Sequence, residues 1–334
     1  MSESGAARRW LPRMVRGTEE QGGRVGQPVA ILLSVYNGEA FLNDQLDSIV
    51  AQTDPNWVVY WRDDGSDDAS RAIMLSFQAH RGAGRCVEIT SHPGRLGIAD
   101  SYMALLAGVP VGACVAFADQ DDVWRAEKLA WAMATMGTGA AGERPILYCG
   151  RQYLTDAALK VRAESAVFRR APGFAAALTQ NIATGHTIVL NAAAVALLRD
   201  FGPPAGVLHD WWAYLVVTAA GGRVAADPRC VSYYRQHSGN TVGAHPSWMW
   251  RGWAALRRGP NMFMAIFDAN VVRLSARPER LDATARAILS DLRACLSQGV
   301  RARWRVLRRW RGLVRQTPSE TLVFRLWFLL SSRR

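Results

Sequence analysis

Three carboxylates stand within four positions of one another, at Asp119, Asp121 and Asp122, directly after the apolar run 115–118. Like charges at this spacing repel unless a cation or fixed dipoles compensate them. A divalent metal ion with hard oxygen ligands would resolve that repulsion and could hold a diphosphate at the same time. The alternative for the cluster taken alone is a solvated acidic turn that caps the next helix. The cluster by itself leaves both interpretations open.

Polar residues also follow two earlier apolar runs. Asn37 comes just after the run 29–35, and Asp63 and Asp64 come just after the run 57–61. A single aspartate in such a place is usually a turn or cap residue. Ligands of parallel sheets, however, bind beyond the carboxyl ends of the strands. Three polar clusters at successive strand ends therefore favour one shared ligand site.

The elements that must position these residues follow from hydrophobic periodicity. Strands are expected at 29–35, 57–61, 87–90 and 115–118, and helices at 39–51, 67–79, 98–107 and 126–136, with Ser66 as the N-cap of the second helix. This alternation predicts parallel βαβ units in an α/β sheet that helices cover on both faces.

The second half of the chain is less regular. Strands are expected at 146–149, 186–190 and 231–234, and helices at 191–199 and 210–220. From Pro246 onward the pattern is mainly helical and rich in arginine. We therefore expect a flexible segment 1–27, a domain 28–245 and a helical basic extension 246–334.

The net charge of +12 indicates anionic partners, such as nucleic acid, an acidic lipid surface or phosphorylated substrates. No zinc spacing, RNP-like aromatic motif or helix-turn-helix accompanies the charge, so no nucleic-acid partner is expected. The five cysteines are odd in number and widely spaced, which predicts buried reduced thiols rather than disulfides or a zinc site.

The chain carries no secretory signal and no apolar run of about 18 residues, the length that spans a bilayer. We expect it to be cytoplasmic. Arginines alternate with tryptophans and aliphatic residues over 301–315, and an apolar stretch follows at 321–330. This pattern fits an amphipathic helix on the inner face of the cell membrane, and equally a surface helix packed on the domain with a solvated arginine face.

Five motifs in a fixed order resemble family 2 glycosyltransferases, and more narrowly the bacterial rhamnosyltransferase-like branch. They are LSVYNG at 33–38, DDGS at 63–66, DQDD at 119–122, HDWW at 209–212 and YRQHSGN at 234–240. Each motif is weak alone, but the set in this order is specific. The resemblance covers roughly 28–243 and implies a GT-A fold, a Rossmann-like, mostly parallel sheet flanked by helices. The segment 92–101 departs from the family's pattern, because only Gly97 is clearly kept, and Arg95 is a candidate to offset the diphosphate charge there.

The resemblance assigns a role to each matching position. The implied donor-binding residues are Ser34, Tyr36, Asn37, Asp63, Asp64, Asp119 and Arg235. A carboxylate at Asp63 or Asp64 would accept hydrogen bonds from the base or ribose, and Arg235 would clamp a phosphate. Asp121 and His237 are the implied ligands of Mg²⁺ or Mn²⁺, and Asp119 is the implied contact to ribose or metal-bound water.

By the same resemblance, Asp210 is the implied general base, which accepts the proton of the acceptor hydroxyl. Its own surroundings equally fit a helix N-cap. Trp211 and Trp212 are the implied acceptor-side residues, where core packing is the alternative. His186 lies where the family often presents acceptor-site residues, and a satisfied core or surface histidine is the alternative.

The resemblance thus implies an inverting, metal-dependent transfer of rhamnose or another hexose. The donor would be a dTDP- or UDP-sugar, and the acceptor a hydroxyl of a cell-surface polysaccharide or a lipid-linked glycan precursor. Two alternatives are a sugar nucleotidyltransferase and a non-catalytic, membrane-associated scaffold with a decayed site. The first would ordinarily carry a basic, glycine-rich phosphate loop after the first strand, which Tyr36-Asn37-Gly38-Glu39 does not supply.

Overall fold

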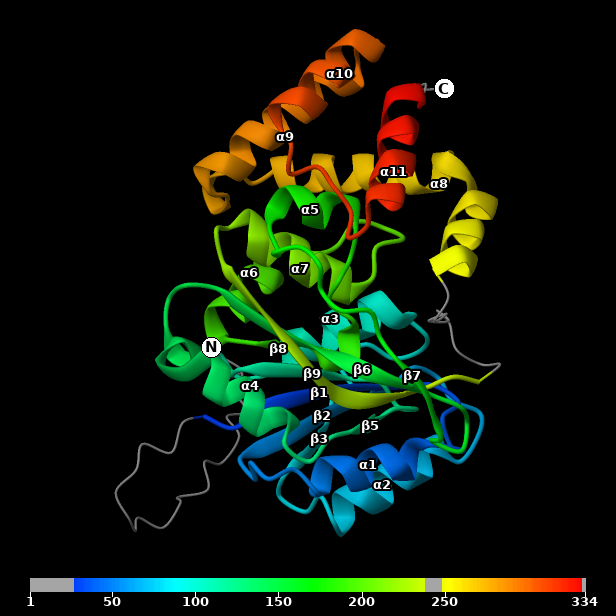
Figure 1. Cartoon of the computed structure of the whole chain (residues 1–334). Helices are drawn as coiled ribbons and strands as arrows, with labels where there is room; N and C mark the ends of the chain where they lie inside the picture. The colour runs from blue at the N-terminus through cyan, green and yellow to red at the C-terminus, as the bar shows by residue number, and fades with distance from the viewer. Residues whose placement is uncertain (1–26, 238–247, 332–334) are drawn as a thin grey trace, which may run out of the picture.

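The computed structural model describes residues 27–237 and 248–331, which are coloured in Figure 1. Almost all of the expected flexible segment 1–27 lies outside the described residues. The expected boundary between domain and extension, at 245 and 246, also lies outside them, as does the end of the YRQHSGN motif.

The elements follow one another as strands and helices in the N-terminal half and mainly as helices after β9. The strands are β1 (Val29–Val35), β2 (Trp57–Asp63), β3 (Cys86–Glu88), β4 (Val115–Ala118), β5 (Val123–Trp124), β6 (Ile146–Thr155), β7 (Val161–Glu164), β8 (Val189–Leu190) and β9 (Arg223–Arg235). The helices are α1 (Leu42–Val50), α2 (Ser70–Ala79), α3 (Ile98–Gly108), α4 (Lys128–Met136), α5 (Phe174–Thr179), α6 (Ala192–Asp200), α7 (His209–Ala219), α8 (Trp248–Ser275), α9 (Ala283–Leu296), α10 (Val300–Arg309) and α11 (Pro318–Leu330).

The strands of the described residues form one sheet in the order β3-β2-β1-β4-β8-β6-β9-β5, with β7 paired to β6. Strands β3, β2, β1 and β4 are parallel, and β6 is parallel to β9, whereas β5, β7 and β8 pair antiparallel. The predicted parallel βαβ order of the N-terminal half is confirmed. The carboxyl ends of β1, β2 and β4 consequently meet at one edge of the sheet. The polar residues that follow these three strands were expected to lie together at such an edge.

The near-continuous apolar sequence of β1 is explained by burial on both faces, as parallel strands require. Ala30 and Leu32 belong to one core, which α3, α5, α6 and α7 cover, and Ile31 and Leu33 belong to the other, which α1, α2 and α4 cover. Figure 1 shows α1 and α2 on one side of the sheet and α3, α6 and α7 on the other.

The C-terminal helices α8 to α11 stack beyond α5 and α7, at the far end of the molecule from α1 and α2 (Figure 1). Phe267 of α8 and Phe324 and Phe328 of α11 are fully buried and belong to the same core as the β1 face toward α3. No helix in the described part of the chain combines the length and the apolar character that crossing a membrane requires.

Several local predictions are corrected by the structure. Ser66 is not the N-cap of α2, because the helix begins at Ser70 and Ala69 occupies the cap position. The Ser66 hydroxyl accepts a hydrogen bond from the Asn37 N–H instead. The expected strand 186–190 is a 3₁₀ turn followed by the short β8, and β9 is much longer than 231–234. The five cysteines are buried and free, as predicted.

Candidate active site

Asp210 lies in the first turn of α7, and it is not the N-cap. Leu208 occupies the cap position, and the Asp210 Oδ1 accepts the Trp211 N–H at 2.6 Å. The Asp210 Oδ2 accepts a hydrogen bond from Asn181 Nδ2 at 3.1 Å. A Cβ at Gly185 would lie 3.0 Å from His209 Nε2, which is tighter than ordinary contact, so a glycine there lets the backbone approach the start of α7 closely. The alternative interpretation of Asp210 as a cap is therefore wrong.

Burial raises the pKa of Asp210 to about 6, and the charge of Asp119 adds to the rise. The hydrogen bonds from Trp211 and Asn181 act in the opposite direction, because they stabilise the carboxylate. A carboxylate with a pKa near neutrality is ionised at pH 7 and still basic enough to take a proton. This is the property that a general base requires.

A buried acid–imidazole cluster lies beyond the end of β4. His186 Nδ1 lies 3.4 Å from Asp119 Oδ2 and in direct contact with Asp122 Oδ2, and both Asp122 and His186 are fully buried. Burial lowers the pKa of His186, but the two carboxylates outweigh it and raise that pKa to about 9. The imidazolium thereby compensates part of the acidic charge. His186 is a buried, satisfied histidine rather than an acceptor-site residue. Because the three side chains also offer ligand atoms close together, the cluster could hold a metal ion.

A second buried cation balances the same carboxylates. Lys128 of α4 is fully buried, its Nζ donates to His186 O at 2.6 Å, and it lies 3.0 Å from the ring centroid of Trp124. Burial lowers the pKa of Lys128, and the charges of Asp122 and Asp119 oppose that shift. The repulsion within the acidic turn is thus partly relieved by side chains of the chain itself.

Tyr102 and His209 pack behind Asp119. The Tyr102 hydroxyl donates to Asp119 Oδ1 at 2.8 Å, and the ring of Tyr102 stacks on His209 with centroids 3.7 Å apart. Burial raises the pKa of Asp119, but His186, His209 and the Tyr102 hydrogen bond lower it to about 2. Burial also lowers the pKa of His209 to about 4, which keeps this imidazole neutral.

Asp121 and His237, the expected metal ligands, lie together. His237 Nε2 is 2.9 Å from Asp121 Oδ2, and about a fifth of each side chain is exposed. Burial raises the pKa of Asp121, and the charge of Asp119 raises it further. The pair is open to solvent, whereas Asp122 and His186 are closed off from it.

Arg235 was expected to clamp a phosphate, and that role stays a prediction, although the residue is almost fully buried. Only 3% of the residue is exposed. Its guanidinium donates to Asp121 O at 3.0 Å, to Asp44 Oδ2 at 2.6 Å and to Ala157 O. The guanidinium therefore positions the backbone of the acidic turn.

The expected nucleotide-side residues surround the end of β1. Gln120 joins this end to the acidic turn, because its side chain exchanges two hydrogen bonds of 2.8 Å with the Tyr36 backbone. Asn37 has a left-handed backbone with φ of 47°, and its Oδ1 accepts the Asp67 N–H. The Ser34 hydroxyl lies 2.7 Å from that of Ser101.

The two aspartates after β2 differ in their surroundings. Asp64 is 4% exposed, and its oxygens accept hydrogen bonds from Leu96 N at 2.7 Å, Gly97 N at 2.8 Å and the buried Arg62. Asp63 is half-buried. Within the part of the chain that the structure describes, its carboxylate accepts a hydrogen bond from the Ser66 N–H alone. Asp64 thus fixes the 92–97 segment, and Asp63 has the more accessible carboxylate.

The tryptophans after Asp210 pack into the protein. Trp212 is fully buried and its indole N–H donates to Phe201 O at 2.7 Å, so its acceptor-side role stays a prediction that this packing does not support. Trp211 is half-buried against the core, and its indole N–H donates to Ala177 O at 2.8 Å. Both positions follow the core-packing alternative.

Comparisons with known proteins find similar chains and one family model. Residues 30–184 match the model of the glycosyl transferase family 2. This match shows a similarity to the family in the N-terminal part of the chain. It is 26% identical over 225 residues to the dTDP-rhamnosyl transferase RfbG of Shigella flexneri, which covers 64% of this chain and 75% of the relative. It is 30% identical over 108 residues to the Escherichia coli UDP-Glc:alpha-D-GlcNAc-diphosphoundecaprenol beta-1,3-glucosyltransferase WfgD, covering 32% of this chain and 40% of the relative.

A solved structure shares the fold of this chain. TarS 1-349 of S. aureus, in complex with UDP-GlcNAc, superposes with a TM-score of 0.55 at 14% identity, covering 79% of this chain and 70% of that one. The predicted GT-A fold is confirmed, and the similarity to RfbG supports the rhamnosyltransferase-like branch.

Sequence reasoning missed three residues of this candidate site. Asn181 orients Asp210, Gln152 Oε1 contacts His186 Nε2 at 2.7 Å, and Lys128 balances the acidic turn. Each reaches the site from an element whose own sequence carries no acidic or glycine-rich motif. A lysine at the start of an otherwise apolar helix was the only signal available.

Proposed function

We propose that the chain is an inverting glycosyltransferase that moves rhamnose or another hexose from a dTDP- or UDP-sugar onto an acceptor hydroxyl. The acceptor is a cell-surface polysaccharide or a lipid-linked glycan precursor. The observation that carries the proposal is Asp210, a half-buried carboxylate with a pKa of about 6 that is linked electrostatically to Asp119 of the acidic turn. The dTDP-rhamnosyl transferase and the UDP-glucose-dependent enzyme among the relatives support the donor class. A sugar nucleotidyltransferase lacks comparable support.

The reaction needs one base and one displacement. Asp210 removes the proton of the acceptor hydroxyl as the acceptor oxygen attacks the anomeric carbon. The bond from that carbon to the diphosphate breaks as the new bond forms, so the anomeric configuration inverts. Asn181 and the Trp211 N–H hold the Asp210 carboxylate in place for this transfer.

The residues present fit a divalent cation. Carboxylates suit Mg²⁺ and Mn²⁺, and the imidazole of His237 beside Asp121 favours Mn²⁺. Asp121 and His237 would hold the ion, with Asp119 toward it, because these three side chains are partly exposed while Asp122 and His186 are closed off. Such an ion, when bound, would neutralise the diphosphate leaving group.

The nucleotide is proposed to lie against the ends of β1 and β2. Tyr36 offers an aromatic face, and Asn37 and Asp63 offer polar groups to the base and ribose. Ser34 and Asp119 complete this pocket. Asp64 contributes by fixing the 92–97 segment that borders it.

Donor hydrolysis tests the proposal. Wild-type protein is incubated with dTDP-rhamnose or UDP-glucose, with and without Mn²⁺, and release of dTDP or UDP is measured. We expect Mn²⁺-dependent release that is lost in Asp121→Ala and retained in Asp47→Ala, an exposed aspartate on α1. Absence of release from both donors in the wild type would refute this donor class.

A peripheral membrane location is the second part of the proposal. Leu322, Leu326 and Leu330 lie one turn apart on α11 and are 60%, 47% and 76% exposed. On α10, Trp304 is 53% exposed and lies among exposed arginines. Apolar side chains beside cations suit an anionic lipid surface.

Vesicle co-sedimentation tests this location. We expect binding to phosphatidylglycerol vesicles and weak binding to phosphatidylcholine vesicles. Replacement of the three leucines by serine should abolish it, while Leu75→Ser, at an exposed leucine of α2, should not. Equal binding by the triple variant would contradict a membrane role for α11.

A further inference from the structure

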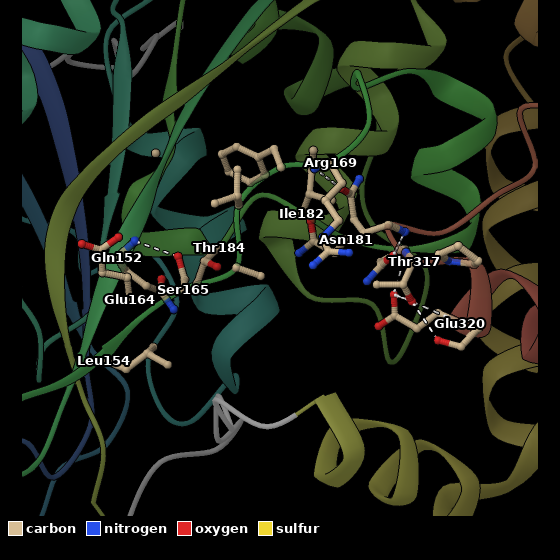
Figure 2. Close-up of a pocket in the computed structure, with 18 residues that line it drawn as sticks. Gln152, Leu154, Glu164, Ser165, Arg169, Asn181, Ile182, Thr184, Thr317 and Glu320 are labelled. Carbon is tan, nitrogen blue, oxygen red and sulfur yellow. Dashed lines mark hydrogen bonds between the residues drawn. The ribbon is translucent and has the colours of Figure 1, made fainter.

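A cavity of about 550 Å³ lies beside the base, between strands β6 and β7 and the start of α11. Figure 2 shows Gln152 and Glu164 at the sheet end of this cavity, Asn181 in its middle part, and Thr317 and Glu320 at the helical end. Its volume lies within the range of about 300–1,000 Å³ that is typical of small-ligand sites. The C-terminal extension therefore supplies one wall of a cavity whose other wall is the catalytic domain.

Two of the lining residues reach the catalytic groups directly. Asn181 donates to the Asp210 carboxylate at 3.1 Å, and Gln152 contacts His186, which in turn contacts Asp122 and Asp119. A molecule in this cavity consequently lies one side chain away from the base and from the acidic turn.

The polar lining consists largely of side-chain amides. The side-chain oxygen of Gln152 contacts His186 Nε2, and that of Gln180 accepts from Gln316 N. The side-chain oxygen of Gln316 accepts from Arg169 N and Arg170 N. The NH₂ groups of these three glutamines have no hydrogen-bond partner among residues 27–237 and 248–331. The oxygens fix the orientation of the amides, and the NH₂ groups are left as donors for a ligand.

The charge of the lining does not favour an anionic ligand. Only one arginine, Arg169, lines the cavity, against two glutamates, Glu164 and Glu320, in a chain whose net charge is +12. Glu320 is held in the capping box of α11 by Thr317, and Glu164 is paired with Arg151 at 2.7 Å. With Arg151 counted, the charges balance, and a phosphate or carboxylate would meet no excess of positive charge here.

We propose that this cavity binds an uncharged sugar unit of the acceptor, next to the unit whose hydroxyl Asp210 deprotonates, with the amide NH₂ groups donating hydrogen bonds to its hydroxyls and Phe168 supplying an apolar surface. The inference rests on the proposed function, and it adds that residues 316–320 of the extension help to select the acceptor. A sugar offers many hydroxyl acceptors and no charge, which matches three oriented donors in a lining without excess positive charge.

Ligand-observed NMR tests this proposal. The probes are the neutral methyl glycosides of rhamnose, glucose and N-acetylglucosamine, with methyl glucuronide and glucose 6-phosphate as charged counterparts. We expect at least one neutral glycoside to bind and the charged ones to bind more weakly. Binding of none of the neutral probes, or tighter binding of the charged ones, would overturn the assignment.

Variants locate the binding. Gln180→Glu and Gln316→Glu keep the engaged oxygen and replace the NH₂ donor, and we expect each to weaken glycoside binding about tenfold. Gln298→Glu, at an exposed glutamine after α9, is the charge-matched control and should not change it. Ala166→Trp fills the cavity without removing any of these hydrogen bonds and should also block binding. Wild-type affinity in all three cavity variants would overturn the proposal.

Failure of this inference differs from failure of the proposed function. If the cavity is not the acceptor site, wild-type protein still releases dTDP or UDP from its donor. If the chain does not transfer sugars, that release is absent whatever the cavity binds.

Discussion

Removing the Asn181 amide should move the pH dependence of catalysis in a defined direction. Asn181 Nδ2 donates to Asp210 at 3.1 Å and stabilises the ionised carboxylate, so it lowers the pKa of the base. In Asn181→Ala that stabilisation is lost while Asp210 stays half-buried. The base then has a higher pKa and becomes protonated at a higher pH.

The size of the shift follows from the strength of the bond. A pKa of about 6 leaves Asp210 roughly 90% ionised at pH 7 and roughly 10% at pH 5, so kcat/KM should fall about tenfold between them. A hydrogen bond to a charged group contributes about 1.5–3 kcal/mol, and one pKa unit corresponds to about 1.4 kcal/mol. Partial replacement of the amide by water reduces this, and we expect an upward shift of about one unit.

The assay is kcat/KM for sugar transfer between pH 5 and pH 9 at saturating Mn²⁺. The position of the acidic limb is the readout, because Asn181 also lines the acceptor cavity and its loss will change rates as well. Asn43→Ala, an exposed residue of α1, should leave the limb in place. An unmoved or downward-shifted limb in Asn181→Ala would refute the coupling of Asn181 to the base.

Three further predictions concern the base, the metal and stability. Asp210→Asn should lower kcat by roughly 10²–10⁴ and abolish the acidic limb, and a persisting limb would assign the base elsewhere. His237→Ala should raise the Mn²⁺ concentration for half-maximal activity about tenfold or more, measured by metal titration, and an unchanged titration would remove His237 from the ligands. Arg303→Met should destabilise the chain by about 2–4 kcal/mol in chemical denaturation, because carbonyls of Leu296, Phe328 and Ser331 lose their buried donor, and wild-type stability would contradict that role.

The motif-bearing strand ends were the part of the site that could be predicted from the sequence. Periodicity located β1, β2 and β4, and the topology of parallel strands brings their carboxyl ends together. Asp121 and His237, far apart in the chain, do lie in contact. The roles proposed for them, for Asp210 and for the nucleotide-side residues stay predictions.

Which side chains face the site could not be predicted from motif positions alone. Arg235 and Trp212 stand in matching motifs, yet each is buried and hydrogen-bonded within the protein. Arg303 counts toward the basic charge of the extension, but it is 5% exposed and donates to three carbonyls at the ends of two helices, α9 and α11. Burial depends on packing between distant elements, which local spacing does not encode. Short elements such as β5 and α5 were missed for the same reason.

Anomalous diffraction at the manganese edge, from crystals grown with UDP and Mn²⁺, tests the central claim most directly. The account predicts a manganese peak bonded to Asp121 and His237, beside Asp119 and in contact with the diphosphate. A peak between Asp122 and His186, or on a surface away from Asp210, would contradict it.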